Sequence, residues 1–234
     1  MSQDHKNRLT ELDSLKALAL VMMLVSNFVS DLNFFKIMEV SKGDTWWYLA
    51  RITASLFVCI SGVSYYLANR KNTNFANVLT RTKRLFFWAF AITIITYFFQ
   101  PDAYIRFGVL HLLALASIVA FPFVQRPILG FLVGLLLFFL PLSSAPLSVW
   151  FGLRETGFFA VDYFPLNPWL GLFFISMVFA KFIYPEGKAL TSINWPEKWL
   201  WLGRNTLLIY VFHQPFLITI LLVTGIVTFD QILD

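Results

Sequence analysis

The chain has 234 residues, of which 58% are hydrophobic, 18% aromatic and 13% charged, whereas about 25% of the residues in an average soluble chain are charged. Its mean hydropathy is +0.70, and no polar stretch between its apolar segments is long enough for a soluble domain. This composition excludes an ordinary soluble protein and predicts one integral-membrane domain over residues 1–234. No basic stretch of the sequence alternates with the aromatic residues of a soluble nucleic-acid-binding surface. The net charge of +5 therefore does not indicate nucleic-acid binding.

Seven apolar segments are candidate membrane-spanning helices, because a helix needs about 20 mainly apolar residues to cross a bilayer. In chain order they are Leu15–Phe34, Trp46–Ala68, Leu85–Gln100, Phe107–Phe123, Pro127–Leu142, Leu166–Ile183 and Leu200–Thr224. The third and the fifth are short. The expected fold class is all-α, a polytopic bundle of about seven transmembrane helices.

The lysines and arginines predict the orientation. With a cytoplasmic N-terminus and seven spans, 13 of them fall on the cytoplasmic side and five on the outer side, as the positive-inside rule requires. The first apolar segment is not followed by a small-residue cleavage site, so we expect it to stay as an anchor. We therefore expect a multi-pass protein of the plasma (cytoplasmic) membrane, the inner membrane of a bacterial cell, with its C-terminus outside.

The first predicted helix carries polar residues at both ends. Asp13 or Ser14 can cap its start. Asn27 and Asp31 are four residues apart near its outer end and therefore share a face. These two residues either form the polar end of the helix at the membrane interface or line a site.

The second predicted helix begins with the tryptophan pair typical of a membrane interface and carries Arg51 about a turn and a half further in. Arg51 can extend back to the outer headgroups, or it can pair with Asp31, with Asp162 or with an anionic ligand. The stretch from Asn69 to Arg84 that follows is expected to be a cytoplasmic loop, and it has five basic residues and no acidic one. Topology and anionic lipid binding explain this charge, and the alternative is a clamp for a phosphorylated cytosolic ligand.

The fourth predicted helix starts with RFGVLHLLALAS, which places Arg106 at the outer edge and His111 inside the apolar core. The two residues are five apart and do not share a face of a regular helix. His111 is either hydrogen-bonded to a neighbouring helix or part of a site, since intramembrane histidines are rare. After the outer loop, the string DYFPLNPW holds Asp162 on a turn stiffened by prolines.

The last predicted helix contains a polar stripe, because Thr206, Tyr210 and His213 return to one face at helical spacing. Pro215 removes one amide donor and crowds the preceding turn, so we expect the helix to kink or open beside His213. In the predicted topology, polar groups from several segments reach the outer half of the bilayer and imply a cavity that opens outward.

Five strings in this order carry a resemblance to a known family. They are LTELDSLKALALVMMLVSNFVSDL, LARITASLFVCISGVS, IRFGVLHLLALAS, DYFPLNPWLG and LGRNTLLIYVFHQP. The chain resembles the small bacterial members of the heparan-α-glucosaminide N-acetyltransferase-like family over essentially its whole length. The resemblance implies a transmembrane acyltransferase bundle that takes an acetyl group from cytosolic acetyl-CoA and delivers it to a sugar or glycan acceptor. Arg51, His111, Asp162 and His213 match positions that are polar in such relatives, whereas Asn27 stands where they commonly have histidine.

Acyl transfer from a thioester requires a base and donors for the developing oxyanion. We expect His213 or His111 as the base, with Asp162 or Asp31 holding a histidine tautomer. Asn27 and Arg51 are expected either to stabilise the oxyanion or to orient the sugar. The residues expected at the substrate are Asp31, Arg51, Arg106 and Tyr210, and those expected at acetyl-CoA are Arg81, Lys83 and Arg84. Membrane lipids and a sugar or glycan acceptor are the expected partners, and the sequence is compatible with a homo-oligomer.

Other classes of membrane protein make different demands on the sequence. A retinal photoreceptor needs a lysine in its last helix, and none follows Trp199. A zinc hydrolase generally needs three ligands, and two embedded histidines do not suffice without a carboxylate, so no metal is expected. The alternative is a permease or flippase for a sugar or lipid-linked substrate, which an outward cavity and a kinked helix would also suit, although no internal repeat is visible.

Overall fold

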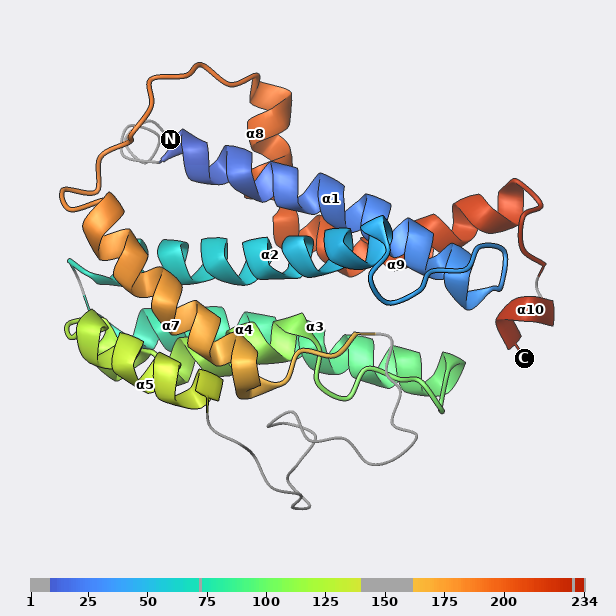
Figure 1. Cartoon of the computed structure of the whole chain (residues 1–234), viewed down its shortest axis with the longest axis horizontal. Helices are drawn as coiled ribbons and strands as arrows, with labels where there is room; N and C mark the ends of the chain where they lie inside the picture. The colour runs from blue at the N-terminus through green and yellow to red at the C-terminus, as the bar shows by residue number, and fades with distance from the viewer. Residues whose placement is uncertain (1–8, 72, 140–161, 229, 234) are drawn as a thin grey trace. The chain divides into compact units, whose positions relative to one another are not determined.

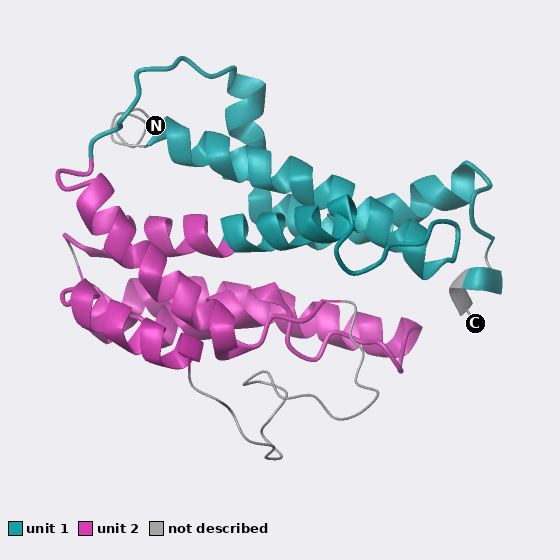
Figure 2. Cartoon of the chain, viewed as in Figure 1, with its two compact units in different colours: residues 1–57, 188–234 teal, residues 58–187 magenta. Residues whose placement is uncertain are grey.

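The structure is a computed structural model that describes residues 9–71, 73–139, 162–228 and 230–233. These residues are helical apart from turns and one isolated parallel bridge between Phe107 and Tyr163. They divide into two compact units (Figure 2): unit 1 contains residues 1–57 and 188–234, and unit 2 contains residues 58–187. The single domain expected over residues 1–234 stays a prediction.

Within the described residues, five helices are long and apolar enough to cross a membrane (Figure 1). They are α1 (Thr10–Phe34), α2 (Thr45–Asn69), α3 (Phe75–Phe99), α7 (Leu166–Ile183) and α9 (Thr206–Val223). The predicted fourth and fifth spans correspond to the shorter apolar helices α4 (Val109–Val119) and α5 (Pro127–Phe139). The chain is therefore a multi-pass helical membrane protein, although the described residues contain fewer helices of spanning length than the seven expected.

The start of α3 corrects one predicted boundary. The helix begins at Phe75 rather than Leu85, because the side chain of Asn74 accepts a hydrogen bond from the amide of Ala76 and caps the helix. Arg81, Lys83 and Arg84 consequently lie in the first turns of α3 and not in a loop. The first helix also begins earlier than expected, at Thr10, so neither Asp13 nor Ser14 is its cap.

The predicted helix over residues 200–224 is wrong in one respect, because it is two helices, α8 (Glu197–Arg204) and α9. The interruption lies at Asn205, whose side-chain amide donates to the carbonyl of Trp201, while the hydroxyl of Thr206 donates to that of Gly203. These side chains bond to carbonyls at the end of α8 in competition with the helical ladder. The expected opening at Pro215 does not occur, because helical backbone continues through it and a proline removes only one donor.

The predicted helix over residues 107–123 also ends early. Helix α4 stops at Val119, and a short 3₁₀ helix, η1 (Phe121–Phe123), follows with Pro122 inside it. Proline cannot donate the amide hydrogen bond that would continue α4. The last residues of the predicted helix 127–142 lie outside the described part of the chain, and a final short helix, α10, covers Asp230–Leu233.

Unit 2 is held together by close helix contacts. Gly134 of α5 and Gly171 of α7 meet where a Cβ on Gly171 would lie 2.7 Å from the carbonyl oxygen of Gly134, so the two backbones approach closely. The hydroxyl of Tyr65 on α2 donates to the carbonyl of Ser117 on α4 at 2.6 Å. These contacts place the end of α2 beside α4 and leave α5 packed on α7.

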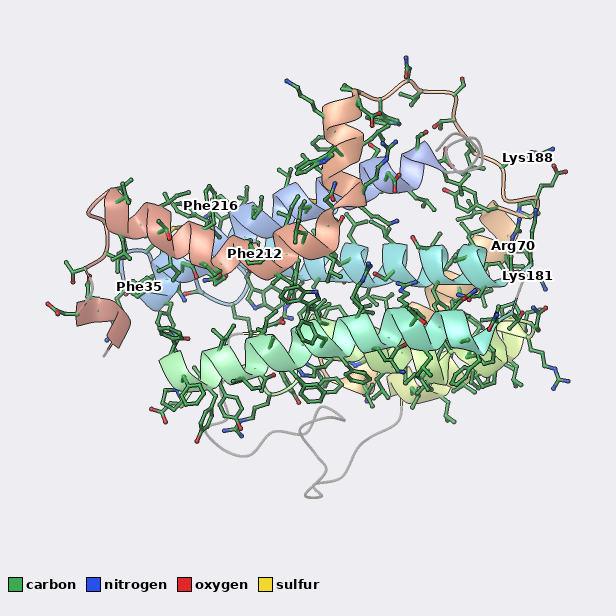
Figure 3. The ribbon with its side chains drawn as sticks, turned by 180° about the vertical axis from the view of Figure 1, so that it is seen from behind. Phe35, Arg70, Lys181, Lys188, Phe212 and Phe216 are labelled. Carbon is green, nitrogen blue, oxygen red and sulfur yellow. The ribbon has the colours of Figure 1, made fainter. Side chains whose placement is uncertain are left out.

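Arg70 connects several elements at one end of unit 2. Its guanidinium donates to the carbonyls of Tyr184 and Pro185 at 2.7 and 2.8 Å, after the end of α7. Its own carbonyl accepts from the side chain of Gln125. Arg70 and Lys181 lie at the same end of this unit (Figure 3), so the ends of α2 and α7 are on one side.

Replacing Arg70 with alanine is expected to lower the free energy of unfolding by about 1 kcal/mol, because two carbonyls lose a charged donor at a partly solvated position. Thermal unfolding of the detergent-solubilised protein measures the change. Lys71→Ala is the matched control, since Lys71 is exposed and adjacent. Equal effects of the two substitutions would contradict a specific role for Arg70.

Candidate active site

A hydrogen-bonded pair connects the two long helices of unit 1. The side-chain amide of Asn27 on α1 lies 2.6 Å from Nε2 of His213 on α9. The other ring nitrogen of His213, Nδ1, is 2.5 Å from the carbonyl oxygen of Tyr210. Since a carbonyl can only accept, Nδ1 carries the proton and the Nε2 lone pair accepts from Asn27. A buried histidine with an oriented basic nitrogen therefore lies inside unit 1.

A second polar pair lies next to the first. Gln214, the residue after His213, donates from its side-chain amide to Oδ1 of Asp31 at 2.5 Å. The other carboxylate oxygen of Asp31 is buried and has no hydrogen-bond partner. A buried oxygen without a partner costs free energy, so Asp31 has an acceptor available to a ligand.

Two further predicted site residues belong to unit 1. The ring of Tyr210 lies 5.3 Å from that of His213, as the helical spacing predicts. Arg51 is exposed, and its guanidinium carbon lies 4.1 Å above the ring of Trp47. Asp31, one of the acidic partners considered for Arg51, is instead bonded to Gln214. A cation–π contact therefore orients Arg51.

His111 has a different environment, at the start of α4 in unit 2. Its Nδ1 accepts from the amide of Gly108 at 3.2 Å, and its Nε2 lies 3.4 Å from the hydroxyl of Thr93. That hydroxyl donates to the carbonyl of Ile105 at 2.7 Å. Both ring nitrogens of His111 are therefore engaged by unit 2, and the ring lies between Phe90 and Phe107.

Asp162 also lies at the start of α4. One of its carboxylate oxygens accepts from the amide of Val109 at 3.1 Å, where a carboxylate stabilises the helix N-terminus. A Cβ on Gly108 would overlap this carboxylate, so glycine permits the close approach. The amide of Phe164 donates to the carbonyl of Phe107 at 2.9 Å. Asp162 and His111 thus lie at the same helix start.

The remaining candidates in unit 2 are basic. Arg106 is exposed, with its guanidinium carbon 4.9 Å from the ring of Tyr104. Arg81 is half-buried, 5.8 Å from the ring of Tyr65. Lys83 and Arg84 are exposed on α3. The three candidates for acetyl-CoA therefore do not share one face, since Arg81 lies against protein and the other two do not.

Gln214 is not among the site residues predicted from the sequence. Its signal was present, because it directly follows His213 in the string HQP and a glutamine is costly in an apolar helix. The hydrogen bond between Gln214 and Asp31 could not be predicted from the sequence, since the two residues are 183 apart in the chain. Among the described residues, no group of three or more His, Cys, Asp or Glu is arranged to hold a metal ion.

The chain matches the model of a known protein family. The family model described as "Heparan-alpha-glucosaminide N-acetyltransferase, catalytic" matches residues 8–215, which include both members of the Asn27–His213 pair. Neither a curated protein nor a solved structure matches the chain.

Proposed function

The chain belongs to the heparan-alpha-glucosaminide N-acetyltransferase catalytic family, and from this premise we propose that it moves an acetyl group from cytosolic acetyl-CoA to an extracytoplasmic sugar or glycan. The observation that supports the proposal within the molecule is the Asn27–His213 pair. An N-acetyltransferase acts on an amine, so an amino sugar is the acceptor that this chemistry favours. The proposed location is the plasma membrane, with the N-terminus in the cytoplasm.

His213 is the proposed general base. The amine nitrogen attacks the thioester carbonyl carbon, the carbon–sulfur bond breaks, and the proton lost by the amine passes to Nε2 of His213. This proton then neutralises the departing CoA thiolate. The bond from Nδ1 to the carbonyl of Tyr210 favours the tautomer with a free Nε2 lone pair. The acceptor amine replaces the Asn27 amide at Nε2, and Asn27 is then free to donate to the oxyanion.

His111 and Asp162 have another role in this proposal. The Nδ1 lone pair of His111 accepts from the backbone amide of Gly108, and its Nε2 lies beside Thr93. The Nε2 lone pair of His213 instead faces a side chain, Asn27, which an acceptor amine can replace. Asp162 bonds the amide of Val109. We therefore assign both residues to the positioning of the α4 start and keep His213 as the base.

Substrate contacts are assigned by charge and burial. Asp31 has a buried carboxylate oxygen without a partner, which suits a hydroxyl or ammonium donor of an amino sugar. Tyr210, whose ring lies beside His213, and Arg51 are further proposed acceptor contacts within unit 1. Lys83 and Arg84, which are exposed on α3, are the proposed contacts to the phosphates of acetyl-CoA, because guanidinium and ammonium groups are the usual phosphate partners. Arg81 lies against Tyr65 instead.

Binding of acetyl-CoA to the purified protein tests the donor half of the proposal. We expect saturable binding by calorimetry and its loss when Lys83 and Arg84 are both changed to glutamine. The matched control changes Lys181 and Lys198 to glutamine, which removes the same charge from other exposed positions of the predicted cytoplasmic side. Equal losses in the two double variants would show a general charge effect and contradict the assigned site.

Release of free CoA on addition of glucosamine tests the transfer itself. The proposal expects release that depends on both acetyl-CoA and the amine, in protein reconstituted into vesicles. Movement of a sugar across the membrane without any acetyl-CoA would instead favour a permease or flippase. No contact among the described residues favours that alternative over transfer.

A further inference from the structure

The segment from Lys188 to Arg204, called here the interfacial segment, is bound to the first turns of α1. Near its start, the amides of Leu190 and Thr191 donate to the carboxylate of Glu11 at 2.9 and 3.0 Å. Lys188 marks this start (Figure 3). One carboxylate thus holds two consecutive backbone amides against α1.

The end of the interfacial segment is bound to the same helix. The indole of Trp199 donates to the hydroxyl of Ser14 at 2.8 Å. The guanidinium of Arg204 lies 3.5 Å from the buried carboxylate of Asp13, and Gly203 packs on the backbone carbonyl of Asp13. Helix α8 therefore lies against the N-terminal part of α1, as Figure 1 also shows.

The segment nevertheless exposes large apolar side chains. Leu190 is 60% exposed, and Ile193 and Trp201 are each 53% exposed. On α8, Leu200 and Gly203 face α1 and are buried. Trp201 is rotated from Leu200 by about 100° around the axis of an ideal helix, so its side chain points away from α1. Because the segment is bound to α1 at both of its ends, these three apolar side chains stay exposed, and we expect a partner to cover them.

The position of α1 identifies this partner. Helix α1 has 25 residues and is about 37 Å long, which exceeds the hydrocarbon thickness of about 30 Å. Its first turn carries Glu11 and Asp13 and therefore lies at the bilayer interface. Helix α8 has eight residues, which is too short for a span. The interfacial segment is bound to the first turns of α1 and must therefore lie at the same depth in the membrane.

We propose that residues 188–204 form an interfacial membrane anchor, with Leu190, Ile193 and Trp201 inserted among the lipid acyl chains. Tryptophan is enriched at this depth. The occupant of the apolar surface is the bilayer, and this inference does not depend on the acetyltransferase activity.

Site-specific nitroxide labels test the proposal in the full-length protein, reconstituted into vesicles of phosphatidylcholine and phosphatidylglycerol. Cys59→Ser removes the one native cysteine, and single cysteines then replace Ile193, Trp201 or, as the matched control on α8, Lys198. We expect labels at 193 and 201 to collide at least several-fold more with oxygen than with a water-soluble nickel chelate, relative to the label at 198.

Two results would overturn the proposal. Nickel access at 193 and 201 equal to that at 198 would place the side chains in water. Labels shielded from both oxygen and nickel would place them against protein, as in contact with a second copy of the chain. Thermal unfolding of each variant shows whether the fold is retained, and Leu190→Cys provides a further labelling position if one variant fails to fold.

Discussion

The His213→Ala variant is expected to release free CoA about 10²–10⁴-fold more slowly than the unmodified protein, the usual contribution of a general base. The reason is the hydrogen bonding of the His213 imidazole. Its Nδ1 donates to the carbonyl of Tyr210, which leaves the basic Nε2 lone pair facing Asn27 inside unit 1. The measurement is glucosamine-dependent CoA release in vesicles. Binding of acetyl-CoA should be nearly unchanged, since the loss concerns the transfer step.

His111→Ala is the matched control for His213→Ala. Its loss removes the acceptor of the Gly108 amide and a partner of Thr93, so we expect lower thermal stability and a smaller effect on the rate of the folded protein. Full activity in both histidine variants would exclude direct transfer with a histidine base. A greater rate loss for His111→Ala, with stability unchanged, would move the base to α4.

The Gly203→Ala variant is expected to be less stable by about 1–3 kcal/mol, the usual cost of overpacking a close contact. A Cβ at position 203 would overlap the backbone carbonyl of Asp13, so α8 would have to move away from α1. The sign of the change in the free energy of unfolding identifies its steric origin. Replacing glycine with alanine inside a helix otherwise stabilises it by about 1 kcal/mol, so a loss of stability indicates overpacking. Thermal unfolding in detergent measures the difference.

Lys198→Ala is the control for Gly203→Ala, since it places alanine at an exposed position of the same helix. It should leave the unfolding temperature nearly unchanged. A displaced α8 should also weaken the Trp199–Ser14 hydrogen bond, which is measurable as faster amide exchange in residues 197–204. A Gly203→Ala variant as stable as the Lys198→Ala variant would show that α8 accommodates the methyl group without moving.

Several features of the chain could be predicted from residue order alone. Apolar length and composition identify a multi-pass helical membrane protein, because backbone groups in lipid must be satisfied within helices. Helical spacing brings Tyr210 onto the face of His213, since contacts three or four residues apart follow from local geometry. The family resemblance rests on continuous strings of residues, and the family match over residues 8–215 confirms it.

Other features depend on contacts between residues distant in the chain. Asn27 and His213 are 186 residues apart, and Asp31 and Gln214 are 183 apart, so no local periodicity pairs them. The break at Asn205 arises from side-chain bonds that compete with the helix, whereas Pro215 is tolerated within α9. The sequence alone offers both His111 and His213 as the base. Only the tertiary structure distinguishes them, because a backbone amide holds the Nδ1 lone pair of His111 whereas a side chain holds the Nε2 lone pair of His213.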